Sequence, residues 1–187
     1  MLEGIYVDHV GVKRVQDLCK NRKTRIIFMP TFKSFADPLV LHYVNFFYNL
    51  ELGFTFGNYE DTPKIHFVDA MIRRLGYFLI KRKDFSKNMF INYINQALLE
   101  DVIENNLVTT IHQNDERPRG GKHTMPLYAD TSIKLILKSY LGLKKFQYDI
   151  KIVPISIEYD RIFDSKYLST EVHEGIFKPG TRLIDVM

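Results

Sequence analysis

Short apolar runs alternate with longer amphipathic segments along the chain. Apolar and β-branched runs predict strands at residues 25–29, 53–56, 76–80, 107–111 and 150–157. Apolar residues at helical spacing predict helices at residues 12–21, 38–48, 62–75, 88–105 and 131–141. Strands separated by helices are typical of an α/β protein. We therefore expect a mixed, largely parallel central sheet that is flanked by helices.

Two of these helices can be specified further. Asp37 followed by Pro38 is the pattern of a helix start, and it predicts Asp37 at the N-cap and Pro38 at the first helical position. The helix at residues 88–105 is predicted to turn one apolar face toward the core. That face consists of Phe90, Ile91, Ile94, Leu98 and Val102.

The composition is that of one globular domain spanning residues 1–187. Apolar residues make up 45% of the chain and charged residues 26%, which suits a protein with a buried core. The net charge of +4 permits contact with anionic lipid but gives no specific support for nucleic-acid binding. The single cysteine, Cys19, excludes an internal disulfide and favours a reducing, intracellular compartment.

The chain carries no apolar run near the roughly 20 residues of a membrane-spanning helix, so no transmembrane segment is predicted. The first residues include Glu3 and Asp8 and do not resemble a targeting peptide. A chain from which a presequence had already been removed would show the same first residues. Any membrane contact of this chain is therefore expected to be peripheral.

Four segments, taken in order, carry the candidate chemistry. They are residues 30–37 (PTFKSFAD), 76–82 (GYFLIKR), 117–122 (RPRGGK) and 152–162 (IVPISIEYDRI). In this order they resemble the motifs P-x-H-R-S-x-x-D, G-x-F-F-I-R-R, F-x-E-G-x-R-S-R-x-G-K and V-P-I-S-x-x-Y-D-R-I of the glycerol-3-phosphate and dihydroxyacetone-phosphate acyltransferases. The resemblance implies one acyltransferase-like domain with its motifs in residues 4–162 and a C-terminal extension at 163–187.

The resemblance also implies a reaction. Members of this family move an acyl chain from a thioester of coenzyme A or acyl carrier protein to a hydroxyl of a phosphorylated three-carbon acceptor. A histidine removes the hydroxyl proton, because its pKa lies in the right range. An aspartate five positions later holds the imidazole and stabilises its charged form. Basic residues of the second and third segments hold the phosphate through charge-assisted hydrogen bonds.

This chain departs from the family pattern where the chemistry is concentrated. The histidine position holds Phe32, the position of the family glutamate holds Asn114, and the glycine after that glutamate is Asp115. Asp37 remains, with helix capping as its expected role. Loss of the base alone removes about 10²–10⁴-fold of rate. We therefore predict no catalytic residues in a motif degenerate at Phe32, Asp37 and Asn114.

The basic residues are the remaining candidates for binding. Five of them occupy positions that resemble the phosphate-binding residues of the family. They are Lys81, Arg82, Arg117, Arg119 and Lys122. The alternative that these are solvated loop charges stays open.

The histidines offer one further alternative. His112 ends a predicted strand beside the third segment and could act as a substitute base, whereas His42 lies on a predicted helix and is interpreted as a surface or packing residue. No histidine pairs with another histidine, with Cys19 or with a carboxylate at metal-ligand spacing, so no metal site is predicted.

We interpret the chain as a catalytically inactive acyltransferase-fold protein. Its expected role is that of an accessory or structural subunit, with protein partners, in a membrane-associated complex. The usual location of family members suggests that this complex is mitochondrial. Two alternatives stay open. One is an active acyltransferase that uses acyl-CoA or acyl-ACP with glycerol-3-phosphate or dihydroxyacetone phosphate, and the other is a lipid- or acyl-carrier-binding module. No cofactor is predicted apart from the coenzyme A or acyl carrier thioester of an active enzyme.

Overall fold

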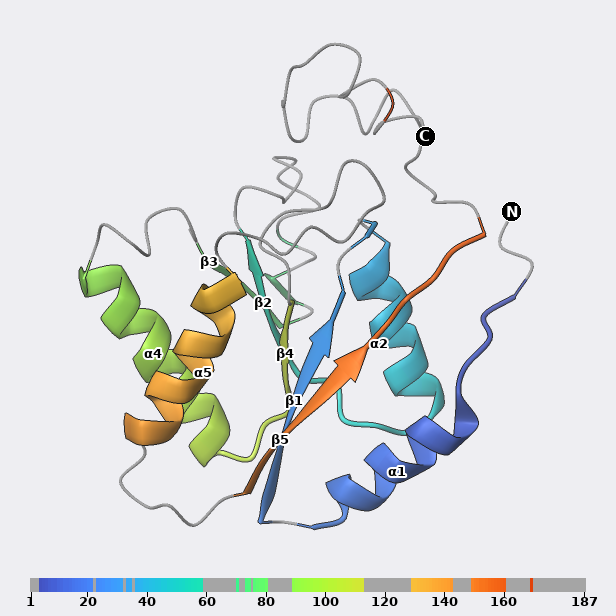
Figure 1. Cartoon of the computed structure of the whole chain (residues 1–187), viewed down its shortest axis with the longest axis horizontal. Coiled ribbons are helices and arrows are strands. Elements are labelled where there is room, and N and C mark those ends of the chain that lie inside the picture. Colours follow the sequence, from blue (N-terminus) through green and yellow to red (C-terminus); the bar gives the residue numbers. More distant parts are fainter. Residues whose placement is uncertain are drawn as a thin grey trace.

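The computed structural model shows an α/β domain built on a parallel sheet (Figure 1). It describes residues 4–21, 23–31, 33–34, 36–58, 70, 73–74, 76–80, 89–112, 129–142, 149–160 and 169. The strands are β1 (Thr24–Pro30), β2 (Phe54–Asn58), β3 (Tyr77–Ile80), β4 (Thr109–Ile111) and β5 (Asp149–Ile155). The helices are α1 (His9–Cys19), α2 (Asp37–Phe47), α4 (Met89–Glu104) and α5 (Ala129–Gly142). The predicted fold class is confirmed, and every described strand pair is parallel.

The strand order is β3-β2-β4-β1-β5, so the chain changes direction across the sheet. From β1 it passes through α2 to β2 and β3 on one side. It then returns through α4 to β4, which lies between β2 and β1, and α5 leads to β5 on the far side of β1. Helices α1 and α2 lie on one face of the sheet and α4 and α5 on the other (Figure 1). The carboxyl ends of the strands form the edge at which α/β proteins bind ligands.

An apolar core fills the face toward α4 and α5. Its members are Ile27, Met29, Phe56, Leu99, Ile103, Ile111, Leu135 and Ile136. The two helices also contact each other closely, because the Ser139 hydroxyl donates to the carbonyl of Gln96 at 3.4 Å and Gly142 lies beside Glu100. Small residues on α5 thus let the two helices cross directly above this core.

The opposite face is apolar near α1 and polar near α2. Residues Ile26 and Phe28 of β1 pack against α1, whereas the alternate residues of the strand point to the first core. Phe28 is in register with Thr110, Thr110 with Thr55, and Thr55 with Tyr77. Side chains in register point to the same face of a sheet, so this row becomes polar as it passes under α2.

Helix α4 presents to the core a face that only partly matches the predicted one, since Val102 is buried and Leu98 packs against the core as expected. Phe90 is 70% exposed and Ile94 is 46% exposed, although both were expected inside. The buried residues are Asn95, Leu99, Val102 and Ile103. The helical phase is set by the contact with α5 at Gln96 and Ser139, which turns the predicted stripe partly toward solvent. The sequence pattern could not reveal this choice, because α4 carries apolar residues around much of its circumference.

The first helix begins earlier than its pattern predicts. It starts at His9 rather than at residue 12, because the Asp8 carboxylate accepts a hydrogen bond from the N–H of Val10 at 3.0 Å and caps the helix. The boundaries of the other described elements lie within two residues of those expected, and the helix predicted at residues 62–75 falls largely outside the described residues.

Candidate functional site

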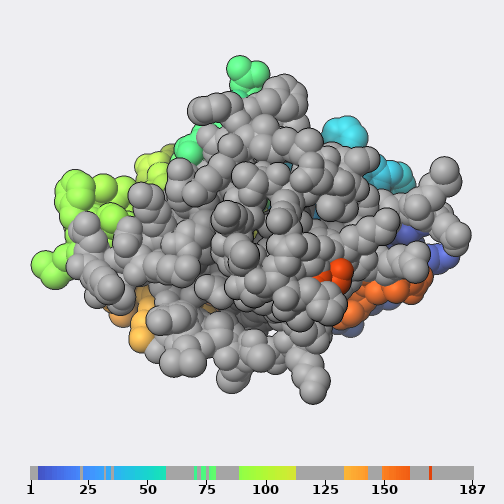
Figure 2. All heavy atoms as spheres, turned by 90° about the horizontal axis from the view of Figure 1, so that it is seen from above, coloured from blue at the N-terminus to red at the C-terminus, as the bar shows by residue number. Residues whose placement is uncertain are grey.

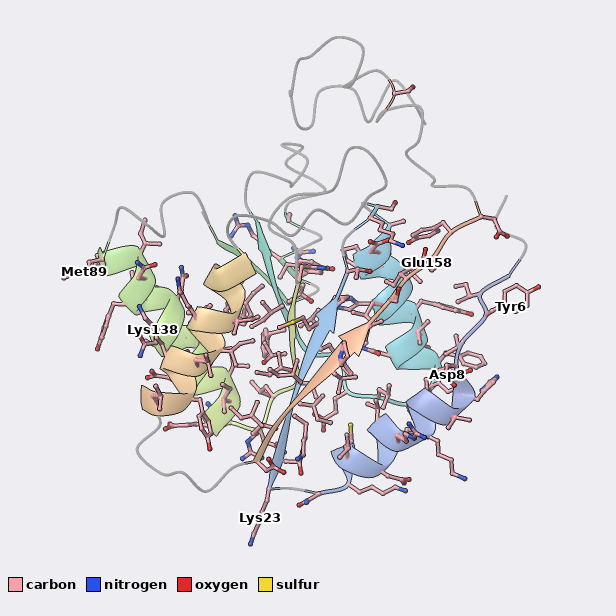
Figure 3. The ribbon with its side chains drawn as sticks, viewed as in Figure 1. Tyr6, Asp8, Lys23, Met89, Lys138 and Glu158 are labelled. Atoms are coloured by element: carbon pink, nitrogen blue, oxygen red, sulfur yellow. The ribbon has the colours of Figure 1, made fainter. Side chains whose placement is uncertain are left out.

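The fold brings the first and fourth segments together at the carboxyl ends of β1 and β5. The two strands are paired from Thr24 to Pro30, and the N–H of Thr31 continues the ladder by donating to the carbonyl of Ile155 at 2.9 Å. Beyond the strands, the Lys33 ammonium forms an ion pair with Glu158, whose position is labelled in Figure 3. Segments more than a hundred residues apart thus form one structural unit.

Asp37 is the centre of this unit. Its side chain is 0% exposed, and one carboxylate oxygen accepts hydrogen bonds from the N–H groups of Lys33 at 2.6 Å and Ser34 at 3.0 Å. The other oxygen accepts a hydrogen bond from the hydroxyl of Tyr159. The carboxylate therefore ties the loop before α2 to the segment after β5.

The prediction that Asp37 is the N-cap of α2 is wrong. Ala36 occupies the N-cap without a capping side chain, and Asp37 is the first helical residue. Its carboxylate turns back to N–H groups that precede the helix rather than to those of the first turn. The reason is tertiary, because the other oxygen of Asp37 accepts a hydrogen bond from Tyr159 in the segment after β5.

Ser34 supports the same loop from inside. Its side chain is 0% exposed, and its hydroxyl oxygen accepts the N–H of Ala36 at 3.1 Å. Its carbonyl accepts the N–H of Asp37 at 3.1 Å. The loop from residue 33 to residue 37 is therefore held by side chains and backbone together, and the polar residues that remain from the first segment have structural partners.

A second polar group lies between α2 and the strands β2 and β3. The rings of His42 and Tyr77 stack with their centroids 5.6 Å apart and 23° between their planes. His42 Nδ1 lies 2.8 Å from the carbonyl oxygen of Pro38 and donates this hydrogen bond, because a carbonyl oxygen can only accept. Among the described residues, His42 Nε2, the Tyr77 hydroxyl and Thr55 Oγ1 are buried and meet no hydrogen-bond partner. Buried polar atoms of this kind commonly bind ordered water.

The surroundings of Tyr77 disfavour its ionised form. Burial raises the pKa of the Tyr77 phenol well above its ordinary value, and the negative charge of Asp37 raises it further. The neighbouring Thr55 hydroxyl opposes this shift in pKa only in part. Tyr77 is therefore neutral at physiological pH and is suited to hydrogen bonding rather than to proton abstraction.

The remaining predicted site residues fall into two groups. His112 follows β4 at the carboxyl edge of the sheet, as predicted, and its side chain is 6% exposed. Its role as a substitute base stays a prediction. The other positions lie outside the described residues. They are Phe32, Lys81, Arg82, Asn114, Asp115, Arg117, Arg119 and Lys122.

Sequence reasoning missed the partner of Asp37. Tyr159 lies 122 positions away from it, and nothing local connects the two residues. The signal was present in the fourth segment, where the tyrosine follows Glu158 in a part of the chain that resembles a family motif. It could be read only once the strands β1 and β5 were known to be neighbours.

Neither metal binding nor membrane spanning finds support in the part of the chain that the structure describes. Within those residues, no three His, Cys, Asp or Glu side chains lie close enough together to hold a metal ion. None of the described helices combines the length and the apolar character needed to cross a membrane.

The chain folds as a parallel α/β domain that brings its first and fourth segments together, and its sequence similarity makes this domain acyltransferase-like. The chain is distantly similar to mitochondrial glycerol-3-phosphate acyltransferase 1. It is 25% identical to the Sus scrofa protein over 165 residues, which cover 85% of this chain. It is 24% identical to the Homo sapiens and Rattus norvegicus proteins over the same length. The alignment covers 19% of each of these relatives, and no family model matches the chain.

Proposed function

We propose that this chain is an acyltransferase-fold protein that does not transfer acyl groups and serves as a protein subunit of a membrane-associated assembly. The names of its relatives describe mitochondrial acyltransferases, and a mitochondrial location is part of the proposal. The relatives are about five times longer than the aligned region, so their activity is not carried over to this chain.

The observation that supports the proposal best is the environment of Asp37. In the family reaction this carboxylate would orient the catalytic imidazole. Here the position of the histidine holds Phe32, which can neither accept nor donate a proton. The carboxylate itself is fully buried and binds Lys33, Ser34 and Tyr159. These structural contacts thus account for an aspartate at this position without a catalytic role.

A second argument comes from the cost of keeping a buried carboxylate. A desolvated charge destabilises a fold unless hydrogen bonds compensate for it. Each oxygen of Asp37 has such bonds, and they join two distant segments. Selection for shape alone therefore accounts for Asp37 after the base has been lost. A role as a binding or scaffolding subunit needs that shape and needs no general base.

An acyl-transfer assay tests the catalytic part of the proposal. The purified chain is incubated with radiolabelled palmitoyl-CoA and either glycerol-3-phosphate or dihydroxyacetone phosphate. We expect no product above the blank without enzyme, while a glycerol-3-phosphate acyltransferase related to this chain serves as the positive control. Circular dichroism of the same sample shows that the chain is folded. Turnover that is lost in a His112→Ala variant would contradict the proposal and identify the substitute base.

Native purification tests the scaffolding part. The chain is tagged at one end in its own cells, extracted with a mild detergent and passed over a sizing column before mass spectrometry. We expect it to elute in a particle much larger than its own 22.0 kDa, together with the same proteins in repeated preparations. Elution of the whole pool at the mass of the free chain would contradict this part and leave the catalytic part untouched.

A further inference from the structure

The outer face of α2 is apolar along its whole length. Its exposed residues are Leu39 (53%), Tyr43 (57%), Phe46 (72%) and Phe47 (67%). Between Asp37 and Glu51 the sequence contains no Lys, Arg, Asp or Glu, and Asp37 is buried. Solvent-facing helices of globular proteins normally carry charged residues on the outer side. A helix without them is ordinarily covered on both sides.

The helix cannot hide this face by turning over. Leu41 and Asn45 are buried on its inner side, His42 is stacked on Tyr77, and Asp37 is bound at its first turn. At its other end, the carbonyl of Tyr48 accepts a hydrogen bond from the Gln16 side chain at 2.7 Å. The aromatic residues are therefore presented to the outside on a rigid support.

A row of rings extends the apolar face from α2 to α1. The centroids of Tyr43 and Phe47 are 6.3 Å apart, those of Phe47 and Tyr48 are 5.2 Å apart, and those of Tyr48 and His9 are 5.7 Å apart. Next to His9, Val10 is 62% exposed. Tyr6, which is 99% exposed, lies at the same side of the molecule (Figure 3). We use the name α2 face for the set made up of Tyr6, Val10, Leu39, Tyr43, Phe46 and Phe47.

The size of the α2 face is that of an interface. A fully covered aromatic side chain buries roughly 150–250 Å². At the exposed fractions given above, Tyr43, Phe46 and Phe47 thus offer on the order of 400 Å² in total. Leu39, Val10 and Tyr6 bring the apolar area toward the ~800 Å² that each partner contributes to a stable interface. A patch of this size exceeds what a typical monomer exposes.

We propose that the α2 face binds the α2 face of a second copy of this chain, so that the protein forms a two-fold symmetric dimer. A two-fold axis brings each helix against its own copy, and α2 tolerates this because it carries no charge between Asp37 and Glu51. The exposed stripe of α5 provides the contrast. There Ile133 and Leu137 alternate with Lys134 and Lys138, whose charges would meet their own copies across an axis.

A lipid surface fits the α2 face less well. Helices that lie on membranes carry lysine or arginine along the border of their apolar face. Helix α2 has none between Asp37 and Glu51, so it lacks the cations that would meet anionic headgroups. The dimer goes beyond the proposed function and does not depend on it, because loss of catalysis and self-association are separate properties.

Sedimentation equilibrium and light scattering test the dimer on the full chain. We expect the measured mass to rise toward twice 22.0 kDa as the concentration increases through the micromolar range. Raising the salt concentration is expected to leave this association unchanged or to strengthen it, because apolar contacts are not screened. Association that weakens steeply with salt would overturn the proposal, since it would point to ion pairs elsewhere.

Two variants locate the contact. Phe46→Lys and Phe47→Lys place a cation on the α2 face near the end of the helix, where a positive charge is compatible with the helix dipole. Each is expected to weaken dimerisation at least about tenfold, as loss of a central aromatic contact does. Leu137→Lys is the matched control, because it makes the same change at an exposed residue of α5. Its mass distribution should equal that of the unchanged chain.

The remaining outcomes all count against the proposal. A monomer at every accessible concentration would overturn it, and so would a dimer that only Leu137→Lys disrupts. Flotation with vesicles of anionic phospholipid is run on the same samples. Binding of a monomer to these vesicles that Phe46→Lys abolishes would replace the second copy by a lipid surface as the occupant. Thermal unfolding of each variant shows that the fold is retained.

Discussion

The buried layer toward α4 and α5 and the buried layer toward α2 differ in chemical character. Toward α4 and α5 the buried layer consists of aliphatic and aromatic side chains such as Ile27, Phe56 and Leu99. Toward α2 the buried layer contains Thr55 at 1% exposure and Asp37 at 0% exposure. Seen from the carboxyl edge, the helices of the first face lie at one side of the molecule and those of the second at the other (Figure 2). The same strands therefore supply an apolar and a polar layer.

The difference indicates that the two layers contribute to the stability of the fold in different ways. An apolar layer gains free energy from every buried methylene group. A polar layer gains little unless each group is paired, and buried atoms without a partner destabilise the fold. Such exceptions are expected near functional or formerly functional sites. The polar layer lies beside the first segment, which is where a relative of the acyltransferases would carry out its chemistry.

The largest effect is expected in the apolar layer. Leu99→Ala removes a side chain of 0% exposure from its centre and should lower the free energy of unfolding by about 3–4 kcal/mol. Urea unfolding followed by circular dichroism measures the change. Leu137→Ala is the control, because Leu137 is 53% exposed and its truncation should change the stability by less than about 0.5 kcal/mol. Similar losses in both variants would show that the assigned core is wrong.

Asp37 should dominate the polar layer. Asp37→Asn keeps the volume of the side chain but removes the charge that accepts hydrogen bonds from Lys33, Ser34 and Tyr159. We expect a loss of about 2 kcal/mol in the free energy of unfolding, because bonds to a charged acceptor are strong. Tyr159→Phe removes one of these bonds and should have about half this effect. In the double variant the two losses should not add, and full additivity would refute the contact.

High pH should weaken the polar layer through Tyr77. In the unfolded chain this phenol loses its proton near its ordinary pKa of 10.0, whereas burial raises the pKa in the folded protein. At a pH above 10.0, the unfolded state therefore binds fewer protons than the folded state, and the free energy of unfolding falls as the pH rises. Tyr77→Phe should make this decline shallower by up to about 1.4 kcal/mol per pH unit.

Unfolding by urea at about pH 9 and about pH 11 measures the slope that belongs to Tyr77. Tyr43→Phe is the matched control, because it removes the same hydroxyl from a side chain that is 57% exposed. An equal slope in the unchanged chain and in Tyr77→Phe would mean that the Tyr77 phenol is accessible to water in the folded state.

The smallest effect is expected for Thr55→Val, where the sign of the change in the free energy of unfolding is informative. Thr55→Val replaces a buried hydroxyl, which meets no partner among the described residues, by a methyl group of similar size. The free energy of unfolding should stay constant or rise by up to about 1 kcal/mol. Ile27→Thr makes the reverse change on the apolar face and should destabilise the fold. A loss in Thr55→Val would instead show that this hydroxyl is bound by an ordered water or by the Tyr77 hydroxyl.

Much of the architecture was predictable because it depends on local patterns. The strand at β1 follows from one continuous apolar run, and the start of α2 follows from Pro38. The alternation of strands and helices predicted the α/β class, and the four ordered segments predicted the distant relationship. The exposure of Phe90 and Ile94 on α4 was not predictable. Apolar residues surround much of that helix, and only its crossing with α5 selects the buried stripe.

The sequence by itself determined that the first segment holds Phe32 at the histidine position of the motif and that residues 38–50 contain no Lys, Arg, Asp or Glu. These are properties of single positions and need no fold. The tertiary structure alone decided that Asp37 binds Tyr159 and that Thr55 and Tyr77 share a buried layer with His42. Such contacts join residues far apart in the chain, and only the order of the strands brings them within the few ångströms over which hydrogen bonds act.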